Sequence, residues 1–313
     1  MEWEEPPTRE HDSAGKSDSQ LHLGGAGPSS GTLASPHPRS PPVVFGKPKP
    51  PLLGLLEVLV FSVIWPASVA AGLIATCGLV LVDSPSLGRL ATAMALGTAG
   101  TLVVYNIDRL RDLHRDRATA PARSAFVERH REALIALSVA SAGACLPLAA
   151  MLPPTTWWAC GVALGLGLFH RRLKGAHRAF AVFYVTLAWL AVVLGIPAAT
   201  FAGELQSPIG VAIVASALGP SIAANLIASD LRGHSLDKST RRRLRTGTWI
   251  ALAGCLGPLA ASGFRPLIAI PLAVCASLAG FRPSEYYGLL GLDAALLLGA
   301  LAAIALLVQG GGG

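Results

Sequence analysis

Charged residues are scarce in this chain, and that scarcity excludes the commonest class of protein. Asp, Glu, Lys and Arg make up only 14% of its 313 residues, whereas about 25% is usual in soluble globular domains. Hydrophobic residues account for 52% of the chain, and its mean hydropathy is +0.54. We therefore predict an integral membrane protein and not a soluble domain.

Two chemical signatures are also missing. The chain has five cysteines, all within apolar segments, and none of them forms a C-x-x-C pair, so neither a zinc site nor a disulfide framework is supported. It contains no Asp-Gly pair. This argues against a CDP-alcohol phosphotransferase, a class of membrane enzyme that uses a D-G-x-x-D pattern.

Long apolar runs begin after Pro51. Residues 1–50 are rich in Pro, Ser, Gly and charge, and we expect them to form a disordered cytoplasmic tail because they cannot bury enough apolar surface to offset the entropy of ordering. Residues 51–309 are expected to form one all-α transmembrane domain, a polytopic membrane helix bundle with about nine transmembrane helices. The predicted spans are 53–82, 87–105, 133–151, 157–169, 179–201, 209–229, 247–263, 266–280 and 286–308; a count of seven or eight stays open.

The basic residues are distributed unevenly between the loops. The loops after the second, fourth, sixth and eighth spans carry seven, four, six and one Lys or Arg, whereas the opposite loops carry only Arg89 and Arg265. Retention of positive loops in the cytoplasm therefore places the N-terminus and the loops after even-numbered spans on the cytoplasmic side, and the C-terminus outside. We expect a multi-pass protein of the cell inner membrane. The net charge of +7 is explained by these loops, so a nucleic-acid partner is not predicted.

One stretch after the second span combines acids and bases. Asp108, Asp112 and Asp116 follow one another at steps of four, with arginines between them. On a helix this spacing places the three carboxylates on nearly one face. Carboxylates suit a divalent cation, above all Mg²⁺, and guanidinium groups suit phosphates. The alternative is a solvated, salt-bridged loop that only fixes membrane topology.

A second acidic segment follows the sixth span. Asp230 and Asp237 are seven residues apart, a spacing that places them on one face of a continuous helix. Both acidic segments follow even-numbered spans, so we expect them to converge on a shared metal cluster. Within the spans, Glu57, Asn225 and Asp293 are polar groups that we expect to face the bundle interior.

These residues resemble a known family, the UbiA-type intramembrane aromatic prenyltransferases, over about residues 52–308. The first family motif, N-D-x-x-D-x-x-x-D followed by Arg and Pro, is matched in this chain by Asp112, Asp116, Arg117, Pro121 and Arg123. Asp108 takes the place of the Asn, and Arg109 stands where the family has its first Asp. The second motif, D-x-x-D-x-x-x-D, is matched by Asp230 and Asp237, with Gly233 in the middle position.

Two further segments carry the resemblance. The stretch H-R-R-L-K, from His170 to Lys174, is similar to the family's Y-x-x-x-K segment, with His170 in place of Tyr. The segment that contains Trp189 and Pro197 looks like the family's fifth helix. Two of the six usual Asp positions are thus replaced, so the resemblance in the site is partial.

The resemblance implies transfer of a prenyl group from a prenyl diphosphate to an aromatic or other lipophilic acceptor. It implies catalytic Asp residues at positions 112, 116, 230 and 237 that hold Mg²⁺ together with Asp108. The groups expected to bind the diphosphate are Arg117, Lys174, Arg172 and Arg109. The acceptor, the prenyl chain length and the oligomeric state are left open.

Two alternatives remain. Arg109, Gly233 and His170 depart from the family pattern, which favours a non-catalytic relative that binds a prenyl lipid or a protein partner. A transporter would use Glu57 and Asp293 as coupling groups. However, the acids of this chain gather at the ends of spans, whereas transporter sites lie near the bilayer midplane.

Overall fold

The computed structural model describes residues 58, 61–174, 178–231 and 235–310, all within the unit Lys49–Gly313. These residues form helices and contain no β-strand, as the composition predicts. The predicted tail and Glu57 lie outside the described residues. The helical elements are α2 (Ile64–Leu81), α3 (Leu87–Thr119), α4 (Pro121–Arg129), α5 (Arg131–Ala150), α6 (Pro154–Lys174), α7 (Arg178–Leu190), η1 (Ala191–Gly195), α8 (Ile196–Thr200), α9 (Pro208–Ser229), α10 (Lys238–Ala253), α11 (Leu256–Ala260), η2 (Ser262–Ile268), α12 (Ala269–Ala279), α13 (Glu285–Tyr287), η3 (Gly288–Leu292) and α14 (Asp293–Gly310).

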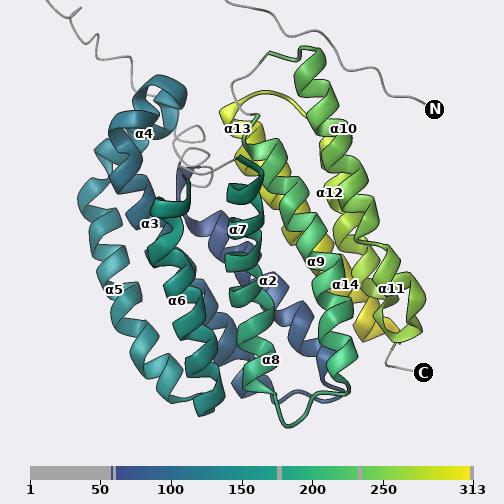
Figure 1. Cartoon of the computed structure of the whole chain (residues 1–313). Coiled ribbons are helices and arrows are strands. Elements are labelled where there is room, and N and C mark those ends of the chain that lie inside the picture. The colour runs from purple at the N-terminus through teal and green to yellow at the C-terminus, as the bar shows by residue number, and fades with distance from the viewer. Residues whose placement is uncertain (1–57, 59–60, 175–177, 232–234, 311–313) are drawn as a thin grey trace, which may run out of the picture. The chain divides into compact units, whose positions relative to one another are not determined.

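The long helices run up and down as a bundle (Figure 1). The C-terminal end of α3, the whole of α4 and α13, the end of α9 and the start of α10 lie at the top of this view. We call this the acidic end, because both acidic segments of the sequence belong to it. The other end is held partly by polar contacts. Arg89, in the first turn of α3, forms an ion pair of 2.6 Å with Glu204, and Gln206 donates a hydrogen bond of 2.6 Å to Asp83.

Helix α2 lies in the middle of the bundle and packs against α3 and α14. Most of its residues are buried, which fits a helix that is apolar on every side. Small residues bring neighbouring helices close together where lipid offers no hydrophobic drive. At Gly299 of α14, a Cβ atom would lie 2.7 Å from the Cα atom of Ile270 in α12, so these two backbones are nearly in contact.

Seven of the described helical segments are long and apolar enough to cross a membrane. They correspond to seven of the nine predicted spans, so the count of nine is not confirmed. The other two predicted spans, 157–169 and 247–263, fall on α6 and on α10 with α11. Helix α6 ends in a basic run, and α10 has 16 residues with five Lys or Arg in its first half. Both regions are helical as expected, but neither contains a helix that is long and apolar enough to cross a membrane.

Two of the described helical segments contain π-helical turns. The turn η1 follows α7 directly, and the turn η3 leads into α14 at Asp293. Single π-helical turns often occur at functional sites, because they shift the side chains that follow onto a different helical face. The turn η1 begins two residues after Trp189, and η3 ends directly before Asp293; both residues belong to the polar group in the bundle interior described below.

Candidate functional site

The acidic row predicted on one helix is present in α3. This helix continues without interruption to Thr119, so Asp108, Asp112 and Asp116 lie on successive turns as their spacing predicts. Asp108 is exposed, whereas Asp112 and Asp116 are half-buried. By helical geometry, Asp112 and Asp116 share a side of α3 with Tyr105 and Arg109. The acidic row therefore runs from the acidic end toward the bundle interior.

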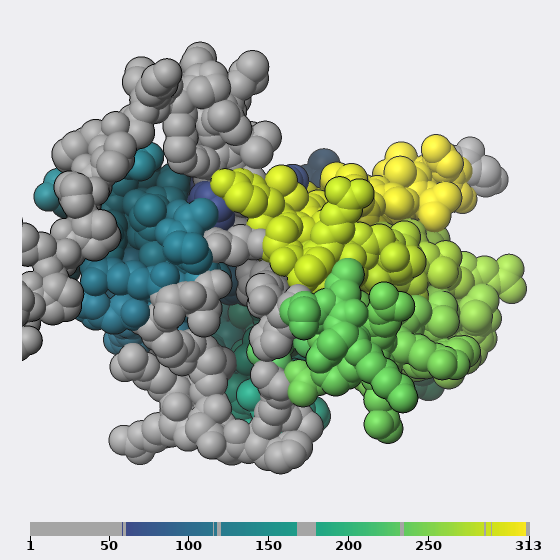
Figure 2. Space-filling model, turned by 90° about the horizontal axis from the view of Figure 1, so that it is seen from above, coloured from purple at the N-terminus to yellow at the C-terminus, as the bar shows by residue number. Residues whose placement is uncertain are grey.

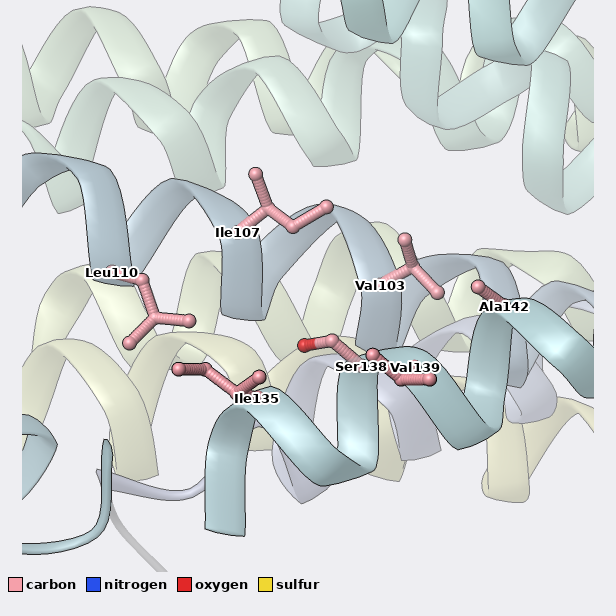
Figure 3. Close-up of a pocket in the computed structure, with 7 residues that line it drawn as sticks. All are labelled: Val103, Ile107, Leu110, Ile135, Ser138, Val139 and Ala142. Carbon is pink, nitrogen blue, oxygen red and sulfur yellow. The ribbon is translucent and has the colours of Figure 1, made fainter. Parts of the chain in front are cut away.

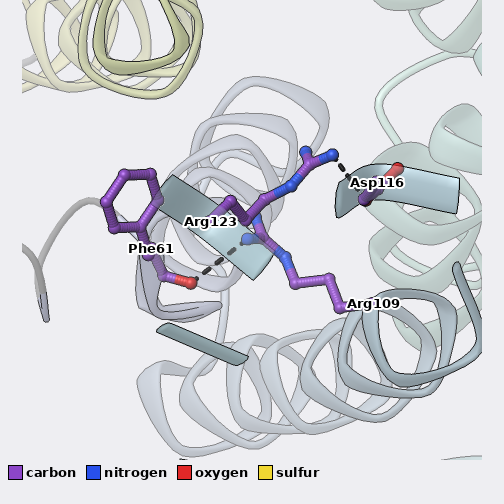
Figure 4. A network of polar contacts seen from close by, with 4 residues as sticks. All are labelled: Phe61, Arg109, Asp116 and Arg123. Carbon is purple, nitrogen blue, oxygen red and sulfur yellow. Dashed lines mark hydrogen bonds and ion pairs between the residues drawn. The ribbon is translucent and has the colours of Figure 1, made fainter. Parts of the chain in front are cut away.

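Asp116 binds an arginine of the next helix. Arg123 of α4 donates a hydrogen bond of 2.5 Å to its Oδ2 atom (Figure 4), and the two side chains are only 16% and 19% exposed. The chain turns at Ala120, where Pro121 begins α4 because the first helical position needs no N–H donor. The ion pair thus fixes α4 against the end of α3. Arg123 is one of the residues that match the family motif, but here its contact is with a proposed metal ligand.

A second ion pair joins the same two helices. Arg117 of α3 lies 2.5 Å from Glu128 of α4, and these side chains are 56% and 43% exposed. Arg117 was predicted to bind diphosphate, and the structure pairs it with a carboxylate near the surface. The two ion pairs have the same N···O distance but differ in solvent exposure, so a comparison of their coupling free energies isolates the effect of burial.

Arg109 is buried, although it belongs to a strongly charged segment. It is 8% exposed, and its Nη1 atom donates a hydrogen bond of 3.2 Å to the carbonyl oxygen of Phe61 (Figure 4). The Phe61 ring packs against Phe126 of α4 and Tyr286 of α13, with ring centroids 6.0 Å and 5.2 Å away. Arg109 therefore fixes the chain before α2 to α3 at the acidic end. This contact was not predictable from the sequence, because Arg109 stands in a charged segment among residues that are exposed.

The second acidic segment does not form a single helix. Asp230 is the residue that follows α9, and Asp237 precedes α10. The prediction that their seven-residue spacing places them on one helical face is therefore wrong, because the helix ends between them. Arg232 and Gly233, in the connection, lie outside the described residues. Both aspartates are exposed.

Asp237 caps helix α10. Its Oδ1 atom accepts a hydrogen bond of 2.7 Å from the backbone N–H of Thr240, and Ser239 donates to both of its oxygens. These hydrogen bonds, that of the Thr240 backbone foremost, lower the pKa of Asp237. Capping of this kind satisfies an N–H group that has no partner within the helix. The Asp-Lys-Ser-Thr sequence was a signal for this role.

The two acidic segments lie at the same end of the bundle (Figure 1). Seen from above, the surface of α3 and α4 occupies one side of this end, and that of α10 and α12 another (Figure 2). Within the described part of the chain, no three His, Cys, Asp or Glu residues are grouped so that they could hold a metal ion. A Mg²⁺ ion shared by both segments stays a prediction. Arg172 and Lys174 belong to the last turn of α6, and their side chains lie outside the described part.

A second set of polar residues lies inside the bundle, next to the acidic row. The Nδ2 atom of Asn225 in α9 donates a hydrogen bond of 3.2 Å to Asp293 of α14, so the prediction that both face the interior is confirmed. The ring of Tyr105 meets that of Trp189 in α7 edge to face at 6.0 Å, and Asp293 is near enough to act on Tyr105 electrostatically. We call Tyr105, Trp189, Asn225 and Asp293 the interior polar group.

Asn106 is a buried residue that the sequence analysis missed. It is 0% exposed, and neither atom of its amide has a hydrogen-bond partner among the described residues. The Oδ1 atom of Asn225 is likewise buried without a partner. Such groups are rare and costly in a protein interior, so each needs a reason. An amide at the junction of an apolar span and a charged segment was the signal that could have identified Asn106.

The described residues also form an apolar groove of about 300 Å³ between α3 and α5 (Figure 3). It is lined by Val103, Ile107, Leu110, Ile135, Ser138, Val139 and Ala142. The α3 residues among them lie on the side of that helix opposite Asp112 and Asp116. The groove is therefore separate from the acidic row.

Comparison of the chain with protein-family models, curated proteins and solved structures gave no match.

Proposed function

We propose that this chain is a membrane prenyltransferase, which transfers a prenyl group from a prenyl diphosphate to a lipophilic acceptor. One observation carries the proposal: two segments rich in Asp and Arg, far apart in the sequence, lie at the same end of an apolar helical bundle. Carboxylates at that end suit an oxygen-seeking cation, and basic residues suit phosphate oxygens. The apolar helices next to them suit a prenyl chain.

The donor chemistry of this end fits Mg²⁺ in part. Asp112, Asp230 and the exposed Asp108 are oxygen donors of the kind that Mg²⁺ prefers. Asp116 and Asp237 already serve an ion pair and a helix cap. When bound, Mg²⁺ would neutralise charge on the departing diphosphate. Arg117, Arg172 and Lys174 are proposed to bind phosphate oxygens.

The interior polar group indicates where the lipophilic acceptor would bind. Tyr105 lies one helical turn beyond Arg109, on the side of α3 that carries the acidic row. A molecule whose polar end reached the interior polar group would lie below a diphosphate held at the acidic end. The surrounding apolar helices exclude water there, which limits hydrolysis of a reactive prenyl group.

The experiment measures binding of labelled geranyl and farnesyl diphosphates to the purified chain with Mg²⁺ or with a chelator. We expect Mg²⁺-dependent binding, lost in Asp112→Asn. Asp83→Asn is the matched control, because Asp83 lies at the opposite end of the bundle and should leave binding unchanged. Equal binding by both variants and the wild type would contradict the proposed site. Extraction of a prenylated lipid from membranes incubated with the same diphosphates would test the transfer itself.

A non-catalytic relative is the second candidate, and three contacts favour it. Arg109, at the first Asp position of the motif, is bound to a backbone carbonyl, while Asp116 and Asp237 have structural partners. If Arg109 takes the role of a lost cation, diphosphate binding should persist in chelator and disappear in Arg109→Ala, since a guanidinium group binds phosphate without a metal. Binding without product, with acceptors supplied, would also favour this candidate.

A further inference from the structure

Helix α10 begins with a basic run that the proposed function does not use. Five of its first eight residues are Lys or Arg, namely Lys238, Arg241, Arg242, Arg243 and Arg245, and all five are exposed. None of them forms an ion pair with an acid in the described part of the chain. The nearest acid in sequence, Asp237, is engaged as the helix cap.

This arrangement is unfavourable for the helix itself. Four pairs of these residues stand three or four positions apart, where like charges repel each other across one face. They also lie at the N-terminal end of α10, where the helix dipole already favours negative charge. Helix stability therefore does not account for the run, and an anion outside the chain would relieve both effects.

The outward face of α10 shows which kind of anion fits. Thr240, Gly247 and Ala251 are buried on the inward face, where α10 packs against α9 and α12. Helical geometry then directs Lys238, Arg242, Arg245 and Trp249 to the opposite side, within about 60° of one another. Trp249 is 63% exposed. In Figure 1, α10 lies at the outer edge of the bundle, and its first turns reach the acidic end.

Distances along this outward face match the layers of a membrane surface. The basic residues Lys238 to Arg245 span about 10 Å, and Trp249 lies about 6 Å farther toward the middle of the bundle, at about 1.5 Å per residue. Tryptophan is enriched at the boundary of the hydrocarbon core, and basic side chains just beyond it meet lipid phosphates. A soluble anion would explain the basic residues but not the exposed Trp249.

We propose that the outward face of α10 is a binding site for the headgroups of anionic phospholipids. Lys238, Arg242 and Arg245 contact the phosphates, and Trp249 lies beside the glycerol region. The site is distinct from the proposed diphosphate site and does not depend on prenyl transfer.

The test measures phospholipids bound to the full chain in a neutral detergent by native mass spectrometry, with dioleoyl phosphatidylglycerol and dioleoyl phosphatidylcholine as probes. We expect a preference for phosphatidylglycerol that weakens between about 50 mM and about 300 mM salt. Each basic residue near anionic lipid is worth about a factor of five, so the triple variant K238Q/R242Q/R245Q should bind phosphatidylglycerol about a hundredfold more weakly. The charge-preserving variant R242K/R245K should stay within about threefold of the wild type.

The matched control removes the same charge elsewhere at the acidic end. Arg111, Arg131 and Arg282 are exposed, so R111Q/R131Q/R282Q should bind phosphatidylglycerol almost as the wild type does. An equal loss in both triple variants would show a general charge effect and overturn the site. Unchanged binding by K238Q/R242Q/R245Q, or equal binding of the two lipids by the wild type, would overturn it as well.

Discussion

The ion pair between Asp116 and Arg123 engages a carboxylate that is also a proposed metal ligand. Its strength therefore determines how readily Asp116 could bind Mg²⁺ instead. Its 2.5 Å contact joins two side chains that are 16% and 19% exposed. Solvent therefore screens it less than an exposed pair, whose coupling is typically about 0.2 to 1 kcal/mol. Hydrogen bonds to charged groups contribute about 1.5 to 3 kcal/mol. We expect a coupling free energy of about 2 kcal/mol between Asp116 and Arg123.

The assay is a double-mutant cycle on equilibrium unfolding in mixed micelles, with Asp116→Asn, Arg123→Gln and the double variant. The pair Arg117 and Glu128 joins the same helices at the same 2.5 Å distance but is 56% and 43% exposed, so it serves as the control. We expect about 0.5 kcal/mol for that pair. Equal coupling in the two cycles would refute the reasoning from burial.

The same cycle, repeated with saturating Mg²⁺, tests the proposed metal site. If Asp116 coordinates Mg²⁺, the ion and Arg123 compete for one carboxylate, so the coupling between Asp116 and Arg123 should fall. The control pair should not respond, because neither Arg117 nor Glu128 is a proposed metal ligand. A coupling that is unaffected by Mg²⁺ would assign Asp116 to a structural role alone.

Three further predictions follow from individual contacts. Gly299→Ala should destabilise the fold by about 1 to 3 kcal/mol in unfolding experiments, because its Cβ atom would meet the α12 backbone at 2.7 Å; Gly161→Ala, which meets nothing within 4 Å, should not. Because hydrogen bonds lower the pKa of Asp237 in the folded chain, the ionised Asp237 cap should stabilise the fold fully above about pH 5 and should lose this effect as the pH falls below about 4. The Asp237→Asn variant should show no such loss when its unfolding midpoint is measured from about pH 3 to about pH 7. Asn225→Leu should destabilise the fold by about 1 to 3 kcal/mol, since Asp293 loses a donor, and adding Asp293→Asn should recover part of that loss; no recovery would contradict the contact.

Much of the fold could be predicted from the sequence, because membrane helices follow apolar length. The end of each helix was harder to predict. The predicted second span stops at residue 105, where charge begins, but α3 continues to Thr119. A span boundary marks the limit of apolar side chains, whereas a helix ends where its backbone hydrogen bonds end. Here that happens at Ala120, just before Pro121.

The candidate site was predictable only in outline. The spacing of Asp108, Asp112 and Asp116 gave the correct geometry because the helix beneath them is continuous. The same argument failed for Asp230 and Asp237, because a helix ends between them. Spacing says which residues share a face only when the backbone that connects them is helical, and the cap at Asp237 was the local signal against this.

The contacts at the acidic end determine which substitution can distinguish binding from folding. Asp116 holds α4, and Asp237 caps α10, so loss of diphosphate binding in variants of either could follow from a displaced helix. Arg109 holds the chain before α2 in the same way. Asp112 lies between Asp108 and Asp116 on a continuous helix, half-buried and on the side that leads to the interior polar group. Asp112→Asn leaves the ion pair of Asp116 with Arg123, the cap at Asp237 and the contact of Arg109 with Phe61 in place. Its effect on Mg²⁺-dependent binding is therefore not confounded by the loss of any of these three contacts.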